Sequence, residues 1–367
     1  MIHYSKFKES SIQGRYINMD SIQKCFSKLS EPLIEIGKSV NQVQIHAFQL
    51  GNGPIKVLLW SQMHGNESTT TKALWDLVNF LRSNDPLAYT ILKECSLMVV
   101  PMLNPDGANV YTRENSNGVD LNRDAKMQSQ PESVALRRLF NSFQPDFCFN
   151  LHDQRTLFSA GNTNKPATVS FLSPASNKER EITPTRETTM KLIAGMNVML
   201  QEHIPGQVGR YDDGFNDNCV GDTFQMLGVP TVLFESGHYP GDYDREITRK
   251  YIFLSLLEAF KIIAEYQVDE FSVGDYFSIP GNRKLFFDII IENAGIVNPR
   301  ISNTHKVGVR YKEVLVDGTV VFEPQITEVG TLNGFYGHKT IECVDTKGFG
   351  FTYADTPLLD LLKNTKE

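Results

Sequence analysis

Several features that define other protein classes are missing from this sequence of 367 residues. Its five cysteines are widely spaced and odd in number, and no two of them form a CxxC pair. This pattern indicates neither a disulfide framework nor a thiolate zinc site, and we expect reduced thiols. No internal repeat and no low-complexity tract is present.

Long apolar runs and an excess of positive charge are missing as well. The N-terminal residues MIHYSKFKESSIQGRYINMD lack the continuous apolar core of a secretory signal. No stretch approaches the roughly 18 apolar residues that a membrane span needs, so we expect no membrane association and a cytoplasmic location. The formal net charge of −7 argues against a nucleic-acid-binding surface. It does not choose a substrate, because an acidic protein can hold a local cationic pocket.

The residues that are present are typical of a globular enzyme-sized chain. A hydrophobic share of 41% and a charged share of 22% are close to globular averages. Up to about residue 266, short apolar runs alternate with longer helical patterns, which predicts an α/β domain over residues 1–266. Strands are expected at 55–60, 97–102, 147–151, 168–172 and 231–234, and helices at 68–81, 131–143, 186–202 and 245–265. Beyond this point Gly, Pro and Asn punctuate short runs, and Asp317–Gly318 is a hairpin signal. We therefore predict a small all-β domain over residues 267–367.

The first cluster of chemically capable residues is His64-Gly65-Asn66-Glu67, directly after the strand that ends at Trp60. When thiolates are absent, zinc prefers imidazole nitrogen and carboxylate oxygen, and a catalytic site has three protein ligands and one open position. Two such ligands three residues apart at a strand-to-helix turn can converge on one ion. Gly65 and Asn66 tolerate the unusual backbone that this turn requires.

Two further candidates stand at strand ends, where open α/β sheets place their ligand sites. His152 follows the apolar strand FCFNL and is the third ligand candidate, and Asp153 beside it is a candidate acceptor for its other ring N–H. Glu235 ends the strand TVLFE, where a carboxylate can take a proton from water and return it to a leaving amine. Taken singly, each also fits an ordinary packed or capping role.

A polar segment lies between these clusters. Asn104-Pro105-Asp106-Gly107 has the composition of a turn. Arg113 and Arg123 flank the loop ENSNG, and a guanidinium matches a carboxylate or stabilises an oxyanion. Either arginine alone is more often a surface residue.

Taken together, HGNE, NPDG, an arginine, GVDLNR, a strand-end histidine and a strand-end glutamate resemble the zinc carboxypeptidase family in their order and spacing over residues 30–265. The resemblance implies a mixed sheet flanked by helices, and one Zn²⁺ per chain held by His64, Glu67 and His152. It further implies that Glu235 is the general base and then the acid.

The resemblance also implies roles on the substrate side. Arg113 would polarise the scissile carbonyl, Asn122 and Arg123 would bind a terminal carboxylate, and Tyr211 is the nearest match to a mobile tyrosine of the family. The implied activity is cleavage of a C-terminal amide or peptide bond by a zinc-bound water. The same ligands also accept cobalt or nickel.

The sequence departs from the family in several places. It lacks the pro-segment and disulfides of the secreted digestive enzymes, and the loop from Arg113 to Asn122 is short. Asp153-Gln154 replaces the family's more usual Ser-Tyr type of sequence. The residue at the base of the side-chain specificity pocket cannot be placed.

Alternatives therefore stay open. One is an aspartoacylase or succinylglutamate desuccinylase type of enzyme that acts on an N-acyl amino acid, since those proteins resemble the chain at the metal site and carry a C-terminal β domain. A metal-free binding module is another, against which the full set of ligands, base and arginines speaks. The β domain itself is an interaction module or a lid over the site.

Overall fold

The computed structural model describes residues 3–344 and 356–365. Contacts divide the chain into two compact units: unit 1 comprises residues 1–154 and 167–282, and unit 2 comprises 155–166 and 283–367. The predicted boundary at 266/267 lies earlier than this division. Residues 267–282 stay with unit 1 because α9 (Val273–Ser278) packs on α6 (Pro184–Gln201) and buries Tyr276 in the same core.

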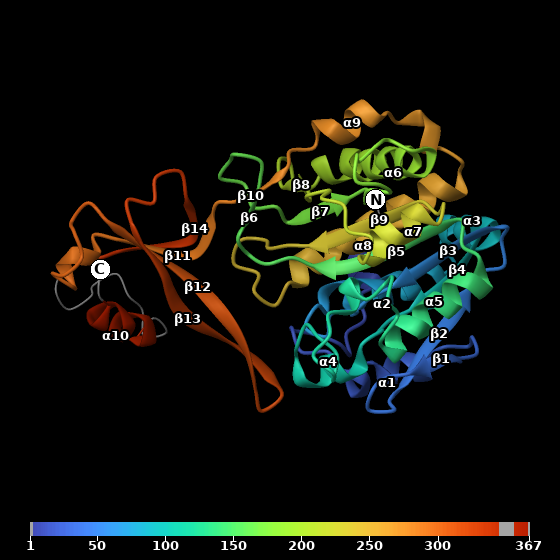
Figure 1. Cartoon of the computed structure of the whole chain (residues 1–367), viewed down its shortest axis with the longest axis horizontal. Coiled ribbons are helices and arrows are strands. Elements are labelled where there is room, and N and C mark those ends of the chain that lie inside the picture. Colours follow the sequence, from blue (N-terminus) through green and yellow to red (C-terminus); the bar gives the residue numbers. More distant parts are fainter. Residues whose placement is uncertain (1–2, 345–355, 366–367) are drawn as a thin grey trace. The chain divides into compact units, whose positions relative to one another are not determined.

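Unit 1 is built on a mixed eight-stranded sheet (Figure 1). Its inner strands β3, β4, β5 and β9 are parallel where they pair, whereas β1, β2 and the β7–β9 pair are antiparallel. In spatial order the strands are β1 (Ile34–Lys38), β2 (Gln44–Leu50), β4 (Cys95–Val100), β3 (Ile55–Trp60), β5 (Phe147–Asp153), β9 (Thr231–Ser236), β7 (Val169–Leu172) and β8 (Val208–Arg210). The predicted α/β fold with a mixed, helix-flanked sheet is confirmed.

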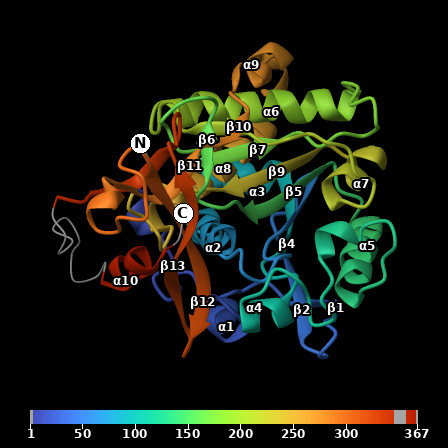
Figure 2. The same ribbon diagram turned by 60° about the vertical axis from the view of Figure 1, so that its left-hand side comes forward.

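Helices cover both faces of this sheet (Figures 1 and 2). Because side chains alternate along a strand, Val57 and Leu59 of β3 face one core and Leu58 and Trp60 face the other. The larger core is formed with α1 (Met19–Ser27), α2 (Thr69–Leu81), α3 (Pro86–Glu94), α6 and α8 (Glu246–Ala264), and the smaller one with α5 (Pro131–Phe143) and α7 (Val220–Met226). Because both faces of the inner strands are buried, their sequences are continuous apolar runs rather than alternating apolar and polar residues.

The remaining elements of unit 1 are short. The NPDG segment, predicted as a turn, forms the start of the six-residue helix α4 (Pro105–Val110), with Asn104 accepting a hydrogen bond from the Gly107 N–H as its N-cap. The 3₁₀ turns are η1 (Tyr4–Lys6), η2 (Leu121–Arg123) and η3 (Val268–Glu270). Within the described ranges, no helix is long and apolar enough to cross a membrane.

Unit 2 contains a four-stranded sheet in the order β13-β12-β11-β14. Its elements are β11 (Phe286–Glu292), η4 (Ala294–Ile296), β12 (Lys306–Val316), β13 (Thr319–Gly330), β14 (Tyr336–Glu342) and α10 (Thr356–Asn364), and β6 (Phe158–Ala160) pairs with β10 (Asn282–Lys284). The predicted Asp317–Gly318 hairpin is confirmed, and both residues have the positive φ that a two-residue turn of this kind needs. The predicted β domain is confirmed in its sheet, but α10 adds a helix to it, and residues 345–355 and 366–367 of the prediction lie outside the described residues.

Candidate metal centre

The candidate site lies where three parallel strands end. β3, β5 and β9 are neighbours in the sheet, and parallel pairing brings their carboxyl ends to one edge. His64 and Glu67 follow β3, while His152 on β5 is directly paired with Glu235 on β9. All four side chains that the sequence placed at strand ends are therefore brought to the same edge.

Three of these side chains converge on one point. His152 Nδ1 lies 2.8 Å from Glu67 Oε2 and 3.1 Å from His64 Nδ1, and His64 Nδ1 lies 2.9 Å from Glu67 Oε1. One ligand atom from each residue lies within 4.8 Å of the others, and all three residues are buried. Nδ1 of both histidines and a carboxylate form a donor set that suits zinc.

The two histidines of the cluster differ in their electrostatics. Burial lowers the pKa of His152 below its usual value despite the charge of Glu67, which favours a neutral ring. Burial acts to lower the pKa of His64 as well, but Glu67 and Asp120 outweigh it and raise that pKa. Burial acts to raise the pKa of Glu67, but the two histidines outweigh it and hold that pKa well below normal. Glu67 is therefore a buried carboxylate, and a buried negative charge needs the positive charge of Arg113 or of a metal ion beside it.

The turn that presents His64 and Glu67 contains one residue with a positive φ, Gln62 at 45°, and is otherwise fixed by close packing. Among the described residues, those with positive φ do not include Gly65 or Asn66, so the expected reason for these two residues is wrong. A Cβ on Gly65 would lie only 2.0 Å from the Gly107 carbonyl carbon, so glycine is required for the approach of this turn to α4. The Asn66 N–H donates to the Thr112 carbonyl oxygen at 3.1 Å.

Asp120 holds the outer side of the cluster, a role that the sequence did not assign to it. Its Oδ1 lies 3.0 Å from His64 Nε2 and accepts the Asn122 N–H at 2.8 Å. The bond to Nε2 leaves Nδ1 of His64 free for a metal. The only signal for this role in the sequence is the GVDLNR motif itself.

Asp153 does not serve His152 as the sequence suggested. Its Oδ2 accepts the Thr69 N–H at 3.0 Å and so satisfies an otherwise free donor at the start of α2, whose preceding residue makes no side-chain cap. Its Oδ1 accepts the Ser236 hydroxyl at 2.7 Å. Asp153 therefore ties α2 to the ends of β5 and β9.

Arg113 borders the cluster and is half-buried. Its Nε donates to Asp120 at 3.0 Å and its Nη1 donates to Glu67 at 3.3 Å. Burial acts to lower the pKa of this guanidinium, but Glu67 and Asp120 raise it, so the arginine is a fixed cation beside the metal ligands.

Asn122 and Arg123 lie on η2, immediately after Asp120. Asn122 Oδ1 accepts the Val220 N–H at 3.0 Å, which fixes that side chain against α7. Arg123 is exposed and donates to the Asn122 carbonyl oxygen at 2.8 Å. The Asn122 side chain is therefore held in place, whereas Arg123 is accessible to solvent.

Glu235 is buried beside the ligands. Burial raises its pKa well above normal, the charges of Glu67 and Asp153 raise it further, and those of Arg113 and Arg245 oppose them. The buried Arg245 was not identified from the sequence, and it donates to the Ser236 and Gln154 carbonyl oxygens at the ends of β9 and β5. Nothing in the sequence around Arg245 marks this role.

The phenol of Tyr211 is partly buried and is affected by the charges of Glu235 and Glu67. Burial raises the pKa of its phenol, and the charges of Glu235 and Glu67 raise it further. Its N–H donates to the Phe171 carbonyl oxygen at 2.9 Å, which anchors the start of the segment that leads from β8 to α7.

Fold and site together define a class: an α/β protein with a buried site of two histidines and one glutamate, and with a carboxylate and a guanidinium beside it. The model of one protein family, described as zinc carboxypeptidase, matches residues 16–216. Since the match spans more than half of the sequence, this chain belongs to the zinc carboxypeptidase family.

Individual relatives are similar to parts of the chain. Carboxypeptidase SOL1 of Arabidopsis thaliana is 36% identical over 121 residues, which cover 30% of this chain and 24% of that protein. Human carboxypeptidase D is 28% identical over 148 residues, or 33% of this chain and 11% of that protein. The chain thus matches a quarter or less of the length of these two relatives.

Solved structures share the fold. A metallo-carboxypeptidase from Burkholderia cenocepacia has a TM-score of 0.54 at 18% identity and covers 67% of this chain and 68% of its own. Thrombin activatable fibrinolysis inhibitor gives 0.54 at 16% identity, covering 72% and 77%. At these identities the likeness concerns the fold alone.

Proposed function

We propose that this protein is a zinc metallocarboxypeptidase that hydrolyses the C-terminal amide or peptide bond of a substrate with a free carboxylate. The observation that carries the proposal is the convergence of His64 Nδ1, His152 Nδ1 and the Glu67 carboxylate within 4.8 Å in a buried site, with Glu235 paired to His152 across β5 and β9. The buried carboxylate and the neutral ring of His152 fit one zinc ion as ligands.

Bound zinc would act as a Lewis acid and would lower the pKa of water towards about 7. Glu235 would then take a proton from the attacking water and return it to the leaving nitrogen. Burial raises the pKa of Glu235, which is the direction that favours a carboxyl group as the proton donor to the leaving nitrogen.

The cationic residues would orient the substrate. Arg113, held by Asp120 and Glu67, would donate to the carbonyl oxygen as negative charge develops on it. Asn122 and Arg123 at the rim would bind the terminal carboxylate, which a guanidinium can hold with two parallel hydrogen bonds. Tyr211 would close on the substrate from the segment between β8 and α7. These roles, and a cytoplasmic location, stay predictions.

The test is a zinc measurement joined to a substrate screen. Elemental analysis of the wild type should give about one zinc per chain, and a His64→Ala, His152→Ala double variant should lose it, since a site with one remaining ligand cannot hold the ion. His203→Ala, which removes an exposed histidine, should keep the zinc. Absence of zinc in the wild type even after reloading would contradict the ligand assignment.

The screen compares two substrate classes on the zinc-loaded protein. We expect release of the C-terminal residue from blocked dipeptides and longer peptides. Release of acetate or succinate from N-acyl amino acids, with no peptide cleavage, would instead support the acylase alternative.

A further inference from the structure

The turn that follows β3 passes through a backbone conformation that glutamine rarely adopts. Gln62, two residues before the ligand candidate His64, has a φ of 45° and is 0% exposed. A residue other than glycine in the left-handed region costs free energy, and it persists only where its surroundings hold it there. The contacts of Gln62 therefore show what fixes the turn that presents His64 and Glu67.

The side-chain amide of Gln62 is hydrogen-bonded to three different parts of unit 1. Its Nε2 donates to the Ile17 carbonyl oxygen at 2.7 Å and to the Gly65 carbonyl oxygen at 2.9 Å. Its Oε1 accepts the Thr71 hydroxyl at 2.9 Å. Both N–H groups and the oxygen of the amide thus have partners, which fixes its orientation. One buried side chain joins the N-terminal segment, the ligand turn and α2.

The bond to Gly65 is one of two that hold the backbone around His64. The Met63 carbonyl oxygen accepts the Asn104 side-chain amide, with Nδ2 at 3.2 Å. The carbonyl groups of the residues before and after His64 are therefore each bound by a buried side-chain amide. The two amide residues are also connected, because the Asn104 N–H donates to the Gln62 carbonyl oxygen at 3.0 Å.

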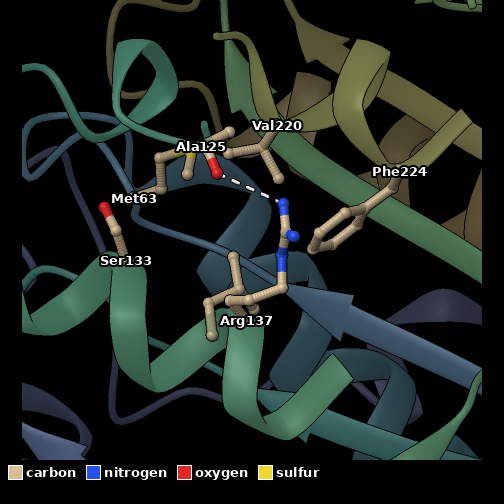
Figure 3. Close-up of a pocket in the computed structure, with 7 residues that line it drawn as sticks. Met63, Ala125, Ser133, Arg137, Val220 and Phe224 are labelled. Atoms are coloured by element: carbon tan, nitrogen blue, oxygen red, sulfur yellow. Dashed lines mark hydrogen bonds between the residues drawn. The ribbon is translucent and has the colours of Figure 1, made fainter. Parts of the chain in front are cut away.

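The residue between Gln62 and His64 anchors the turn on its other side. Met63 is 1% exposed, and Figure 3 shows its side chain among those that line the pocket between α5 and α7. Met63 belongs to the smaller core, whereas Ile17 belongs to the larger one. An apolar contact resists displacement but does not direct a peptide group, so the orientation of the turn depends on the hydrogen bonds of Gln62 and Asn104.

We propose that Gln62 is a positioning residue for the metal ligands: it binds the Gly65 carbonyl group and so keeps His64 and Glu67 in place for one ion. This inference rests on the proposed zinc site. Ligands that are held before the ion arrives lose little conformational freedom when it binds, so the affinity is higher. The positive φ of Gln62 follows from the same arrangement, because three hydrogen bonds hold the residue against its local preference.

The test separates zinc affinity from stability. Gln62→Met keeps the length of the side chain but removes its three hydrogen bonds. We expect its zinc dissociation constant to rise by about 10-fold or more, the lower end of the effect of removing a side chain that supports a ligand. Competition with a chelator measures this constant, and urea denaturation of the zinc-free proteins measures stability.

Gln225→Met is the matched control, because it removes another buried glutamine. Gln225 is 2% exposed, and its Nε2 donates to the Thr189 hydroxyl at 3.0 Å and to the Thr231 carbonyl oxygen at 3.4 Å. Thr231 begins β9, at the end of the strand away from Glu235. This variant should lose stability but bind zinc as the wild type does.

The visible spectrum of the cobalt-loaded protein gives a readout that a loss of stability alone does not change. Cobalt accepts the same ligands as zinc, and its absorption bands depend on the coordination geometry. The bands should change in position or intensity in Gln62→Met. In Gln225→Met they should superimpose on those of the wild type.

Wild-type zinc affinity and an unchanged cobalt spectrum in Gln62→Met would overturn the inference and leave the proposed zinc site intact. A wild type that binds no zinc would overturn both. If Gln62→Met does not fold, Gln62→Asn replaces it, because asparagine adopts the left-handed conformation more readily. Its amide is one methylene too short to keep both carbonyl contacts, so wild-type zinc affinity in that variant would be equally contrary to the proposal.

Discussion

At the scale of single residues, Asp120 organises the site more than any residue that the sequence had singled out. It is bonded to His64, to Arg113 and to the backbone of Asn122, so one carboxylate positions a candidate metal ligand and the two neighbouring residues for which we propose substrate contacts. The Asp120 pKa shows this charge balance: burial would raise it, but the histidine and the arginine hold it well below normal.

Replacing Asp120 by asparagine should lower zinc affinity by about 10- to 100-fold, the usual effect of removing an outer partner of a ligating histidine. Asparagine has one acceptor oxygen instead of two, so its amide nitrogen must face either His64 or Arg113, and the negative charge between them is lost. A competition titration with a chelator measures the dissociation constant. Asp217→Asn, which alters a partly exposed residue paired with Lys126, should bind zinc normally. Equal affinity in both variants would contradict the role of Asp120.

Glu235→Gln should keep one zinc per chain and lower kcat by about 100- to 10,000-fold, the span that general acid–base catalysis supplies. Glutamine has the same size and hydrogen-bonding reach but no basic oxygen pair for the water proton. Parallel measurement of zinc content and kcat on a peptide separates binding from chemistry. A variant with near wild-type kcat would remove Glu235 from the mechanism.

At the scale of elements, the site depends on how the connection from β3 to α2 packs against α4. Gly65 allows the contact, because a Cβ would overlap the Gly107 backbone, and Asp153 joins the N-terminus of α2 to β9. The positions of His64 and Glu67 are thus fixed by neighbouring elements and not by the turn alone.

Gly65→Ala should destabilise the zinc-free protein by about 3 kcal/mol or more, since neither backbone can move away without shifting α4. Gly281→Ala is the control, because a Cβ there would have no atom within 4 Å, and it should change stability by less than about 0.5 kcal/mol. Urea denaturation followed by circular dichroism measures both. Similar small losses in the two variants would show that the turn is more adaptable than its packing indicates.

The sequence predicted the long elements of unit 1 because their apolar patterns are strong. The helix at 131–143 was predicted with its observed bounds, since Pro131 opens it and its apolar positions repeat with helical spacing. The edge strand β1, its neighbour β2 and the short helices α3 and α4 were not predicted, because they depend on pairing and caps rather than on a long pattern. At the site, ligand types and strand-end positions were visible in the sequence. The contacts of Asp120, Asp153 and Arg245 were not visible, because they join residues far apart in the chain.

At the scale of the whole molecule, a buried ionic network in unit 1 connects the N-terminal segment with α2 and α8. Arg249 forms an ion pair with Asp76 at 2.6 Å with both side chains fully buried, and Lys72 pairs with Glu246 at 2.6 Å. Arg249 also donates to the Glu9 carbonyl oxygen. Loss of one partner leaves an uncompensated buried charge, so the network is sensitive to protonation.

The stability of the protein should therefore fall in acid. For Glu246, burial would raise the pKa, but Lys72 outweighs it and lowers the pKa from 4.5 to about 2. A lowered folded-state pKa stabilises the protein above about pH 4.5, and this contribution is lost as the pH falls towards 2. In urea denaturation, Glu246→Gln should be less stable than the wild type at pH 7, and the difference should shrink by pH 3. Glu265→Gln, at an exposed position, should be as stable as the wild type at both pH values. If the stability difference between Glu246→Gln and the wild type were the same at pH 7 and pH 3, the pairing of Glu246 with Lys72 would be contradicted.

The later boundary of unit 1 gives another stability prediction. Tyr276 on α9 is 0% exposed and its hydroxyl accepts the Ser173 N–H, whereas the adjacent Phe277 is 45% exposed. Tyr276→Ala should lower the free energy of unfolding by about 3–5 kcal/mol, because it removes a buried ring. Phe277→Ala should lower it by less than about 1 kcal/mol, because that ring is largely exposed. Equal losses on denaturation would mean that α9 does not belong to this core.

The segment 155–166 leaves unit 1 directly after Gln154 and belongs to unit 2, although the rest of unit 2 begins only at residue 283. The Leu157 carbonyl oxygen accepts the Phe286 N–H, a partner 129 residues later in the chain. At ribosomal rates of about 5–20 residues per second, Phe286 is synthesised roughly 6–26 seconds after Leu157. The native pairing of segment 155–166 therefore cannot form while residues 167–282 of unit 1 are being synthesised. Unit 2 assembles only after all of unit 1 has been made.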